Sequence, residues 1–319
     1  MKSKLGTALH WLAWLILANA IVVLFVRFFG LIEFPPYVQL VAFPEWVAAS
    51  LAYAAAIEIF RKHAELVAAH CIAIALILFA QPNMKSDWPV TPVGTEIEIL
   101  TANIKMGQGI DALVELIKRE EPDLVFVQEC NQRCADALHG KEIKKLLQHQ
   151  ILDPKANSAG AAILSKYTFS IPVEPFRPQA LGTEFSMPEA ILEVPEVGTI
   201  AVKSAHPFPP VPQAERLWAS GLQALSKFAM HYGSMPVIVA GDFNSGVEHK
   251  QFRDVMDSGR LRDAAVELGV DKYTWTMDGR RYVQATIDHI LFSSGQARSL
   301  LVYPIEGSDH QALLSTIRF

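Results

Sequence analysis

The stretch Val237-Ile-Val-Ala-Gly-Asp-Phe-Asn244 decides the fold, because a short apolar run passes directly into a polar loop. Four consecutive apolar residues, three of them β-branched, predict a strand that is buried on both faces. Asp242 and Asn244 stand where this strand ends, and open α/β sheets bind their ligands at such ends. One polar strand end does not by itself predict a site, so the other strand ends of the chain must be considered.

Five further strand ends or starts carry carboxylates, amides or imidazoles. They are occupied by Asn103, Glu129, His206, Asp288 and the pair Asp309-His310. Side chains at the same ends of adjacent strands converge on one cleft, and hard oxygen donors suit Mg²⁺ or Mn²⁺ better than zinc. The sequence therefore predicts a divalent-metal site.

Strands and amphipathic helices alternate from Glu96 to the last residue. The mixture predicts stacked sheets covered by helices. The predicted helices are 110–121, 213–231 and 249–257, and the predicted strands are 96–103, 123–127, 161–164, 189–194, 199–204, 237–240, 285–292, 298–303 and 312–318.

The first 80 residues are dominated by apolar side chains. Leu9 to Phe29 is long enough to cross a hydrocarbon core, which needs about 20 helical residues. A cleaved signal peptide is the competing interpretation, but no small-residue cleavage site stands out. Segments 37–60 and 64–80 are weaker second and third spans. We therefore predict an anchor at 1–81, a linker at 82–94 and a catalytic domain at 95–319.

Basic residues set the expected topology. Lys2 and Lys4 precede the first span, and Arg61 and Lys62 lie between the second and the third. The positive-inside rule places both segments in the cytoplasm, so three spans put the catalytic domain outside it. A two-span anchor instead puts the catalytic domain in the cytoplasm.

Charge and cysteine content narrow the function further. Residues 1–93 carry 6 basic and 5 acidic side chains, and the remainder carries 22 basic and 28 acidic ones. A net charge of −6 on the catalytic part disfavours long nucleic acids. Cys71 lies in an apolar run. Cys130 and Cys134 form either two packed thiols on a helical turn, which is favoured, or a disulfide.

Six short motifs occur in a fixed order: Thr101-Ala-Asn103, Val127-Gln-Glu129, Ser204-Ala-His206, Gly241-Asp-Phe-Asn244, Ile287-Asp-His-Ile290 and Ser308-Asp-His310. Together they resemble the endonuclease/exonuclease/phosphatase superfamily over about residues 96–319. The resemblance implies a four-layer α/β/β/α sandwich with two central sheets between helical layers. It also implies metal-dependent hydrolysis of a phosphoester.

The same resemblance implies the metal site. Glu129 is then the main ligand of Mg²⁺ or Mn²⁺, with Asn103 and Asp309 close to the ion. Lys105 stands where apurinic endonucleases of the superfamily carry an acidic neighbour of the metal, so a second metal site is in doubt. Taken singly, Glu129 and Asn103 have plain structural interpretations, as a helix-start carboxylate and a turn former.

The resemblance implies the catalytic roles as well. His310, oriented by Asp288, acts as general base or holds the phosphate, and Asp242 is the rival base or merely an Asx-turn residue. Asn244 and His206 bind the phosphoryl oxygens and stabilise the charge that develops there. His289 should face away from this site along its strand.

The substrate is indicated by the anchor and by a stiff loop, His206-Pro-Phe-Pro-Pro210. Phe208 and Trp275 either pack in the core or shelter an apolar group. Anchor and loop together resemble the membrane-bound bacterial branch that includes VanJ-type proteins, which implies a lipid-linked phosphate or pyrophosphate in the bilayer as substrate. An extracytoplasmic nuclease and a non-catalytic membrane scaffold are the alternatives, and no obligate protein partner is evident.

Overall fold

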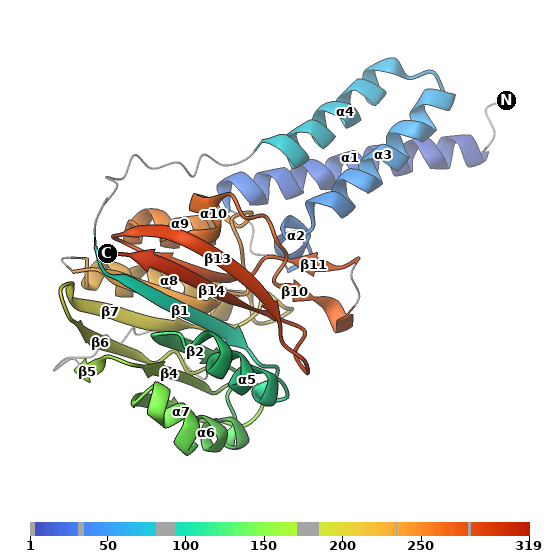
Figure 1. Cartoon of the computed structure of the whole chain (residues 1–319). Helices are drawn as coiled ribbons and strands as arrows, with labels where there is room; N and C mark the ends of the chain where they lie inside the picture. Colours follow the sequence, from blue (N-terminus) through green and yellow to red (C-terminus); the bar gives the residue numbers. More distant parts are fainter. Residues whose placement is uncertain (1–3, 31–34, 81–93, 171–184, 234, 280–281) are drawn as a thin grey trace. The chain divides into compact units, whose positions relative to one another are not determined.

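The computed structural model describes residues 4–30, 35–80, 94–170, 185–233, 235–279 and 282–319 (Figure 1). Contacts divide the chain into two units. The helical unit comprises 1–85 with the short segments 210–212 and 247–250, and the α/β unit comprises the rest. All of the predicted linker 82–94 except Gly94 lies outside the described residues.

The helical unit contains α1 (Lys4–Phe29), α2 (Pro35–Val41), α3 (Pro44–Phe60) and α4 (Ala64–Phe79). Among the described helices, α1 alone is long and apolar enough to cross a membrane as a single helix. The predicted second span is broken, since α2 and α3 meet at an angle of 98°. Phe43, which precedes Pro44, has φ −127° and ψ 60° because proline disfavours the helical conformation of the residue before it.

The α/β unit is built on two six-stranded sheets. Sheet A has the order β13 (Gln296–Pro304), β14 (Gln311–Arg318), β1 (Glu96–Asn103), β2 (Leu124–Gln128), β4 (Ala161–Ser165) and β3 (His149–Asp153). Sheet B has the order β5 (Thr168–Ser170), β6 (Glu189–Val194), β7 (Gly198–Ala205), β8 (Val237–Asp242), β12 (Asp288–Phe292) and β9 (Arg262–Asp263).

Each sheet contains one parallel pair among otherwise antiparallel neighbours. In sheet A, β1 is parallel to β2, and in sheet B, β7 is parallel to β8. Parallel neighbours need a crossover connection, and α5 (Ile110–Glu120) and α8 (Glu215–His231) supply it. The two halves of the unit thus repeat one strand–helix–strand plan.

Alternation along the strands produces the layers. Phe126 and Ile163 of sheet A pack against Val202 and Ile290 of sheet B in one buried core between the sheets. The intervening side chains of sheet A, such as Val125, face the helices α5, α6 (Gln132–Leu138) and α7 (Lys141–Leu146).

On sheet B, the Lys203 ammonium lies over the ring of Phe228 in α8, which covers the outer face. The unit is therefore the four-layer α/β/β/α sandwich that the sequence predicts.

The last third of the unit adds α9 (Lys250–Gly259), α10 (Ala264–Leu268) and the short ribbon of β10 (Trp275–Thr276) and β11 (Gln284–Ala285), with a 3₁₀ turn at Met277–Gly279. The predicted strand 285–292 is split between β11 and β12. The split lies at Thr286 and Ile287, and the N–H groups of Ile287 and of Asp288, which begins β12, both donate to the hydroxyl of Thr274 at 3.0 Å.

Candidate active site

The carboxyl ends of the two parallel pairs meet, and the amide of Asn103 joins them. Its Nδ2 donates to Oε1 of Glu129 at 3.2 Å and to Oδ2 of Asp242 at 3.0 Å. His206 Nε2 lies 3.9 Å from each of the same two carboxylates. One residue from each of the four parallel strand ends therefore contributes to a single site, as the sequence predicts.

Glu129 is held in an uncommon backbone conformation, with φ 61°. Its Oε2 accepts a hydrogen bond of 2.7 Å from the backbone N–H of Met106, in the loop after β1. A non-glycine residue in the left-handed region costs free energy and clusters at functional sites. The carboxylate is thereby turned toward Asn103 rather than along the strand.

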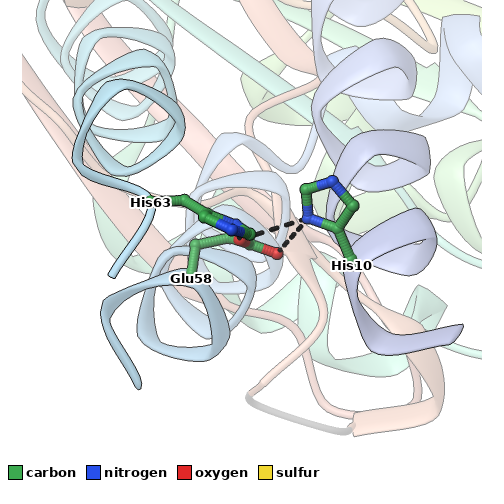
Figure 2. Close-up of side chains that lie close together, drawn as sticks. All are labelled: His10, Glu58 and His63. Carbon is green, nitrogen blue, oxygen red and sulfur yellow. Dashed lines mark hydrogen bonds and ion pairs between the residues drawn. The ribbon is translucent and has the colours of Figure 1, made fainter. Parts of the chain in front are cut away.

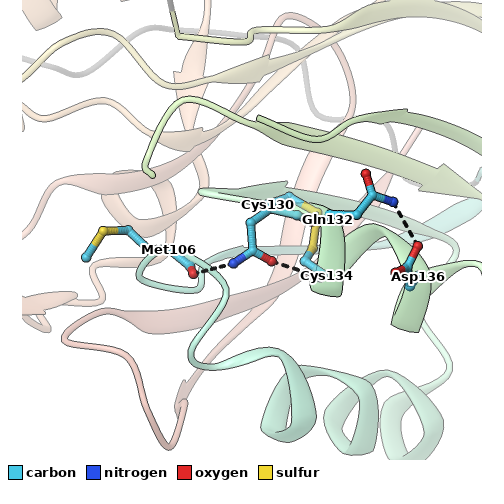
Figure 3. Close-up of a disulfide and its surroundings, with 6 residues drawn as sticks. Met106, Cys130, Gln132, Cys134 and Asp136 are labelled. Atoms are coloured by element: carbon cyan, nitrogen blue, oxygen red, sulfur yellow. Dashed lines mark hydrogen bonds between the residues drawn. A yellow bond between two sulfur atoms is a disulfide. The ribbon is translucent and has the colours of Figure 1, made fainter. Parts of the chain in front are cut away.

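The loop that follows Glu129 is closed by a disulfide between Cys130 and Cys134, whose Cα atoms are 5.3 Å apart (Figure 3). The favoured interpretation of two packed thiols is therefore wrong, although both residues are buried. Asn131 caps α6 by accepting from Cys134 N at 3.1 Å, and its amide donates to Met106 O at 2.7 Å. These bonds fix the loop after β2 to the loop after β1.

The Gly241-Asp-Phe-Asn244 loop combines close approach with a turn. Gly241 has φ 149°, and a Cβ there would lie 2.1 Å from the carbonyl oxygen of Ala205, so glycine lets β8 approach β7. Oδ1 of Asp242 accepts from Asn244 N at 2.7 Å, as in an Asx turn. Oδ2 of Asp242 accepts from Asn103, so the same side chain both forms the Asx turn and contributes to the site.

Asp288 and His310 form the second part of the site. His310 Nδ1 lies 2.9 Å from Oδ2 of Asp288, and its Nε2 lies 3.8 Å from Oδ2 of Asp242. Asp288 stands opposite Asp242 in the β12–β8 register, which explains why the two carboxylates are neighbours. Oδ1 of Asp288 is buried without a hydrogen-bond partner among the described residues, which suits a site that binds a cation.

Burial and charge shift three pKa values. Burial raises the pKa of Asp242 to about 7, with the charge of Asp288 adding to the effect against that of His310. Burial lowers the pKa of His310, but the charges of Asp288 and Asp242 outweigh it and raise the pKa to about 9. Burial lowers the pKa of His206 to about 3. At neutral pH, His310 is a cation and His206 is neutral.

Asp309 occupies a more exposed place beside this group. Its carboxylate pairs with Lys105 Nζ at 3.3 Å. The flanking residues are anchored, because the Ser308 hydroxyl donates to Asn103 O at 2.8 Å and His310 bonds to Asp288. The ammonium of Lys105 thus lies where the sequence comparison expected an acidic neighbour of a second metal.

The donor set fits a hard divalent cation. Glu129 and Asp242 both accept from the Asn103 amide, whose Oδ1 accepts from Lys105 N at 3.0 Å, and Asp288 lies opposite Asp242. Uncompensated buried negative charge of this kind is costly. Carboxylate oxygens of Asp242 and Asp288 lie within 4.8 Å of each other. The Asn103 amide donates to both Glu129 and Asp242, so the predicted ligand Glu129 lies beside the same carboxylates.

Some residues that support the site carry no sequence signal of their own. His289 faces away, as predicted, but its Nδ1 lies 2.5 Å from Oδ2 of Asp263 and its Nε2 lies 3.1 Å from Ser245 O. This buried pair holds the loop that follows Asn244. Thr274 and Ser308 orient the backbone at Asp288 and His310.

The family described as "Endonuclease/Exonuclease/phosphatase family" matches residues 100–310. A comparison with curated proteins gives no significant sequence match.

Truncated TDP2 from Caenorhabditis elegans is 17% identical over 70% of this chain and 98% of its own, with a TM-score of 0.58. D. rerio TDP2 complexed with single-strand DNA product is 16% identical over 70% of this chain and all of its own, with a TM-score of 0.56. The 3′ phosphatase NExo from Neisseria, bound to a product DNA hairpin, is 18% identical over 70% of this chain and all of its own, with a TM-score of 0.52.

These structures share the fold of the α/β unit. The family match spans all six strand-end motifs, from the strand that carries Asn103 to His310. The chain belongs to the endonuclease/exonuclease/phosphatase family.

Proposed function

We propose that this protein is a membrane-anchored, divalent-metal-dependent phosphoesterase that hydrolyses a lipid-linked phosphate or pyrophosphate. The observation that carries the proposal is the Asn103 amide, which joins Glu129 to Asp242 beside the His310–Asp288 pair. A phosphate anion repels an attacking hydroxide, so catalysis needs positive charge and hydrogen-bond donors around it. The site supplies both.

The residues divide this work. Glu129 and Asn103 hold Mg²⁺ or Mn²⁺, with Asp309 nearby, and the ion supplies Lewis-acid stabilisation of the phosphoryl oxygens. His310, kept cationic by Asp288, binds a phosphoryl oxygen, and neutral His206 and Asn244 add hydrogen bonds. Asp242, with its pKa near 7, accepts the proton of the attacking water. Asp242 rather than His310 is therefore our choice of general base.

The substrate class rests on features outside the phosphate site. The length and apolar composition of α1 support membrane anchoring, and anchoring raises the effective concentration of lipid head groups. Beside His206, the ring of Phe185 lies 4.8 Å from the imidazole and stacks on Phe208 at 4.1 Å, which gives the site an apolar rim. Trp275 is half-buried and makes an antiparallel bridge with His310.

The proposed location is a bacterial inner membrane that the anchor crosses more than once, with the catalytic domain outside the cytoplasm. The disulfide Cys130–Cys134 supports this side, because disulfides persist in oxidising compartments. A nuclease is the second candidate, favoured by the DNA products bound in two of the similar structures.

Phosphate release by the detergent-purified protein tests the proposal. Undecaprenyl pyrophosphate, a phospholipid and plasmid DNA serve as substrates, with Mg²⁺ or EDTA, beside the variants Glu129→Gln and His310→Ala. We expect Mg²⁺-dependent release from the lipid pyrophosphate that both variants lose. Cleavage of DNA alone identifies the nuclease, and inactivity on all three substrates with a phenotype that survives Glu129→Gln identifies the scaffold.

A further inference from the structure

The helical unit contains a second cluster of titratable side chains. His10 of α1, Glu58 of α3 and His63 at the start of α4 point toward one another (Figure 2). Glu58 is completely buried, and its two oxygens lie 3.1 Å from His10 Nδ1 and 2.5 Å from His63 Nδ1. None of the three has a part in the phosphoesterase site.

The geometry of this cluster is set by the backbone. His63 N donates to Glu58 O at 3.1 Å, so the turn between α3 and α4 fixes the spacing of the two residues. His63 precedes the first residue of α4 but makes no capping hydrogen bond with its side chain, which turns to Glu58 instead. His10 completes the group from a distant part of the sequence.

The donor set is that of a transition-metal site. Two imidazole nitrogens and one carboxylate oxygen lie within 4.8 Å of one another. Zinc holds such ligands at 2.0–2.2 Å in a tetrahedron, which places ligand atoms about 3.3 Å apart, a spacing that modest side-chain rotations reach. Imidazole ligands favour zinc and its neighbours over Mg²⁺, in contrast to the oxygen-rich catalytic site.

Two neighbouring features support binding. A cavity of about 650 Å³ borders the cluster and leaves a coordination position open to water or an anion; its walls include His10, Trp14, Arg61, Lys62, His63 and Glu65. A buried carboxylate among apolar helices needs positive charge close by. Arg61 Nε, at 3.8 Å from Glu58, lies beyond hydrogen-bond distance, so the two imidazoles are the groups that contact the carboxylate most closely.

We propose that His10, Glu58 and His63 bind a first-row divalent transition metal, zinc above the others, separately from the catalytic ion. The metal would join α1 to the α3–α4 hairpin, which lies about 50 residues further along the chain. Its ligands come from α1, α3 and the start of α4, so it stabilises the helical unit as a structural ion does.

Metal binding to the full-length protein tests the proposal. The protein is purified in detergent with a tag that contains no histidine, stripped with EDTA and titrated with Zn²⁺ or Co²⁺ in excess Mg²⁺. Any Zn²⁺ that the catalytic site takes up despite Mg²⁺ is measured in His63→Gln and subtracted. Stoichiometry is measured by elemental analysis, and coordination by the visible absorption of Co²⁺. Glu65→Gln is the matched control, because it removes a carboxylate from the same cavity wall.

We expect one Zn²⁺ per wild-type chain and a tetrahedral Co²⁺ spectrum. His63→Gln and Glu58→Gln should weaken Zn²⁺ binding by about 100-fold or more, since loss of even an outer partner of a zinc ligand costs 10–100-fold. Glu65→Gln should bind normally, and His63→Cys should restore binding with a thiolate ligand, which separates loss of a ligand from misfolding. Equal Zn²⁺ binding by wild type, His63→Gln and Glu58→Gln, or no binding by wild type, overturns the proposal.

Discussion

Replacing Asp288 with asparagine removes the charge that keeps His310 protonated. The pKa of His310 is raised from 6.5 to about 9, which corresponds to about 3 kcal/mol in favour of the imidazolium. Three carboxylates raise this pKa: Asp288, at 2.9 Å, contributes most, Asp242, at 3.8 Å, is the second, and Asp309 is the third. Assigning Asp288 about half or more gives a decrease of roughly 1–2 pKa units.

The assay is a pH profile of kcat/KM for bis-p-nitrophenyl phosphate with saturating Mg²⁺. In wild type, activity should fall at high pH as His310 loses its proton. In Asp288→Asn this alkaline decrease should move down by about 1–2 pH units, with a loss of about 2–10-fold at pH 8.

Asp263→Asn is the matched control, because it breaks the buried Asp263–His289 pair on the other face of the same strand. It should lower thermal stability and leave the alkaline limb in place. A uniform loss of activity in Asp288→Asn with no movement of that limb would refute the role assigned to the His310 cation.

Three further predictions concern stability, followed by circular dichroism of the purified protein. Gly241→Ala should lower the free energy of unfolding by roughly 3 kcal/mol or more, because a Cβ meets Ala205 O at 2.1 Å and φ is 149°; an unchanged melting temperature contradicts this. Reduction of the disulfide, or the double change Cys130→Ser with Cys134→Ser, should cost about 2 kcal/mol for so short a loop, with no effect of reductant on the double variant. The folded state protonates His206 only near pH 3 whereas the unfolded chain does so near 6.5, so wild-type stability should fall as the pH drops between these values, by up to about 1.4 kcal/mol per unit. In His206→Asn the stability should fall less steeply with decreasing pH. Parallel stability curves for the variant and wild type would contradict the role of His206.

Much of the α/β unit is predictable because its signals are local. The strand 96–103 is observed with the predicted bounds, and the polar residues that follow the parallel strands converge because parallel strands end at one edge. The contact between Asn103 and Asp242 spans both sheets, yet each residue is recognisable from its own strand end.

Other features depend on contacts that no local pattern encodes. Thr274 divides the predicted strand 285–292 through hydrogen bonds from a remote loop. The Asp263–His289 pair joins residues whose neighbours give no hint of one another. Pro44 did carry a local signal for the break between α2 and α3, but the length of the apolar run outweighed it in the prediction of one span.

The convergence of the two parallel pairs makes catalysis sensitive to the distance between the sheets. Asn103 and Glu129 belong to one sheet, and His206 and Asp242 to the other, so a change in the core between the sheets moves the two halves of the site apart. Phe126 lies fully buried in that core. Replacing Phe126 with leucine should therefore reduce turnover at temperatures well below unfolding. The rate of phosphate release then reports on the distance between the two sheets.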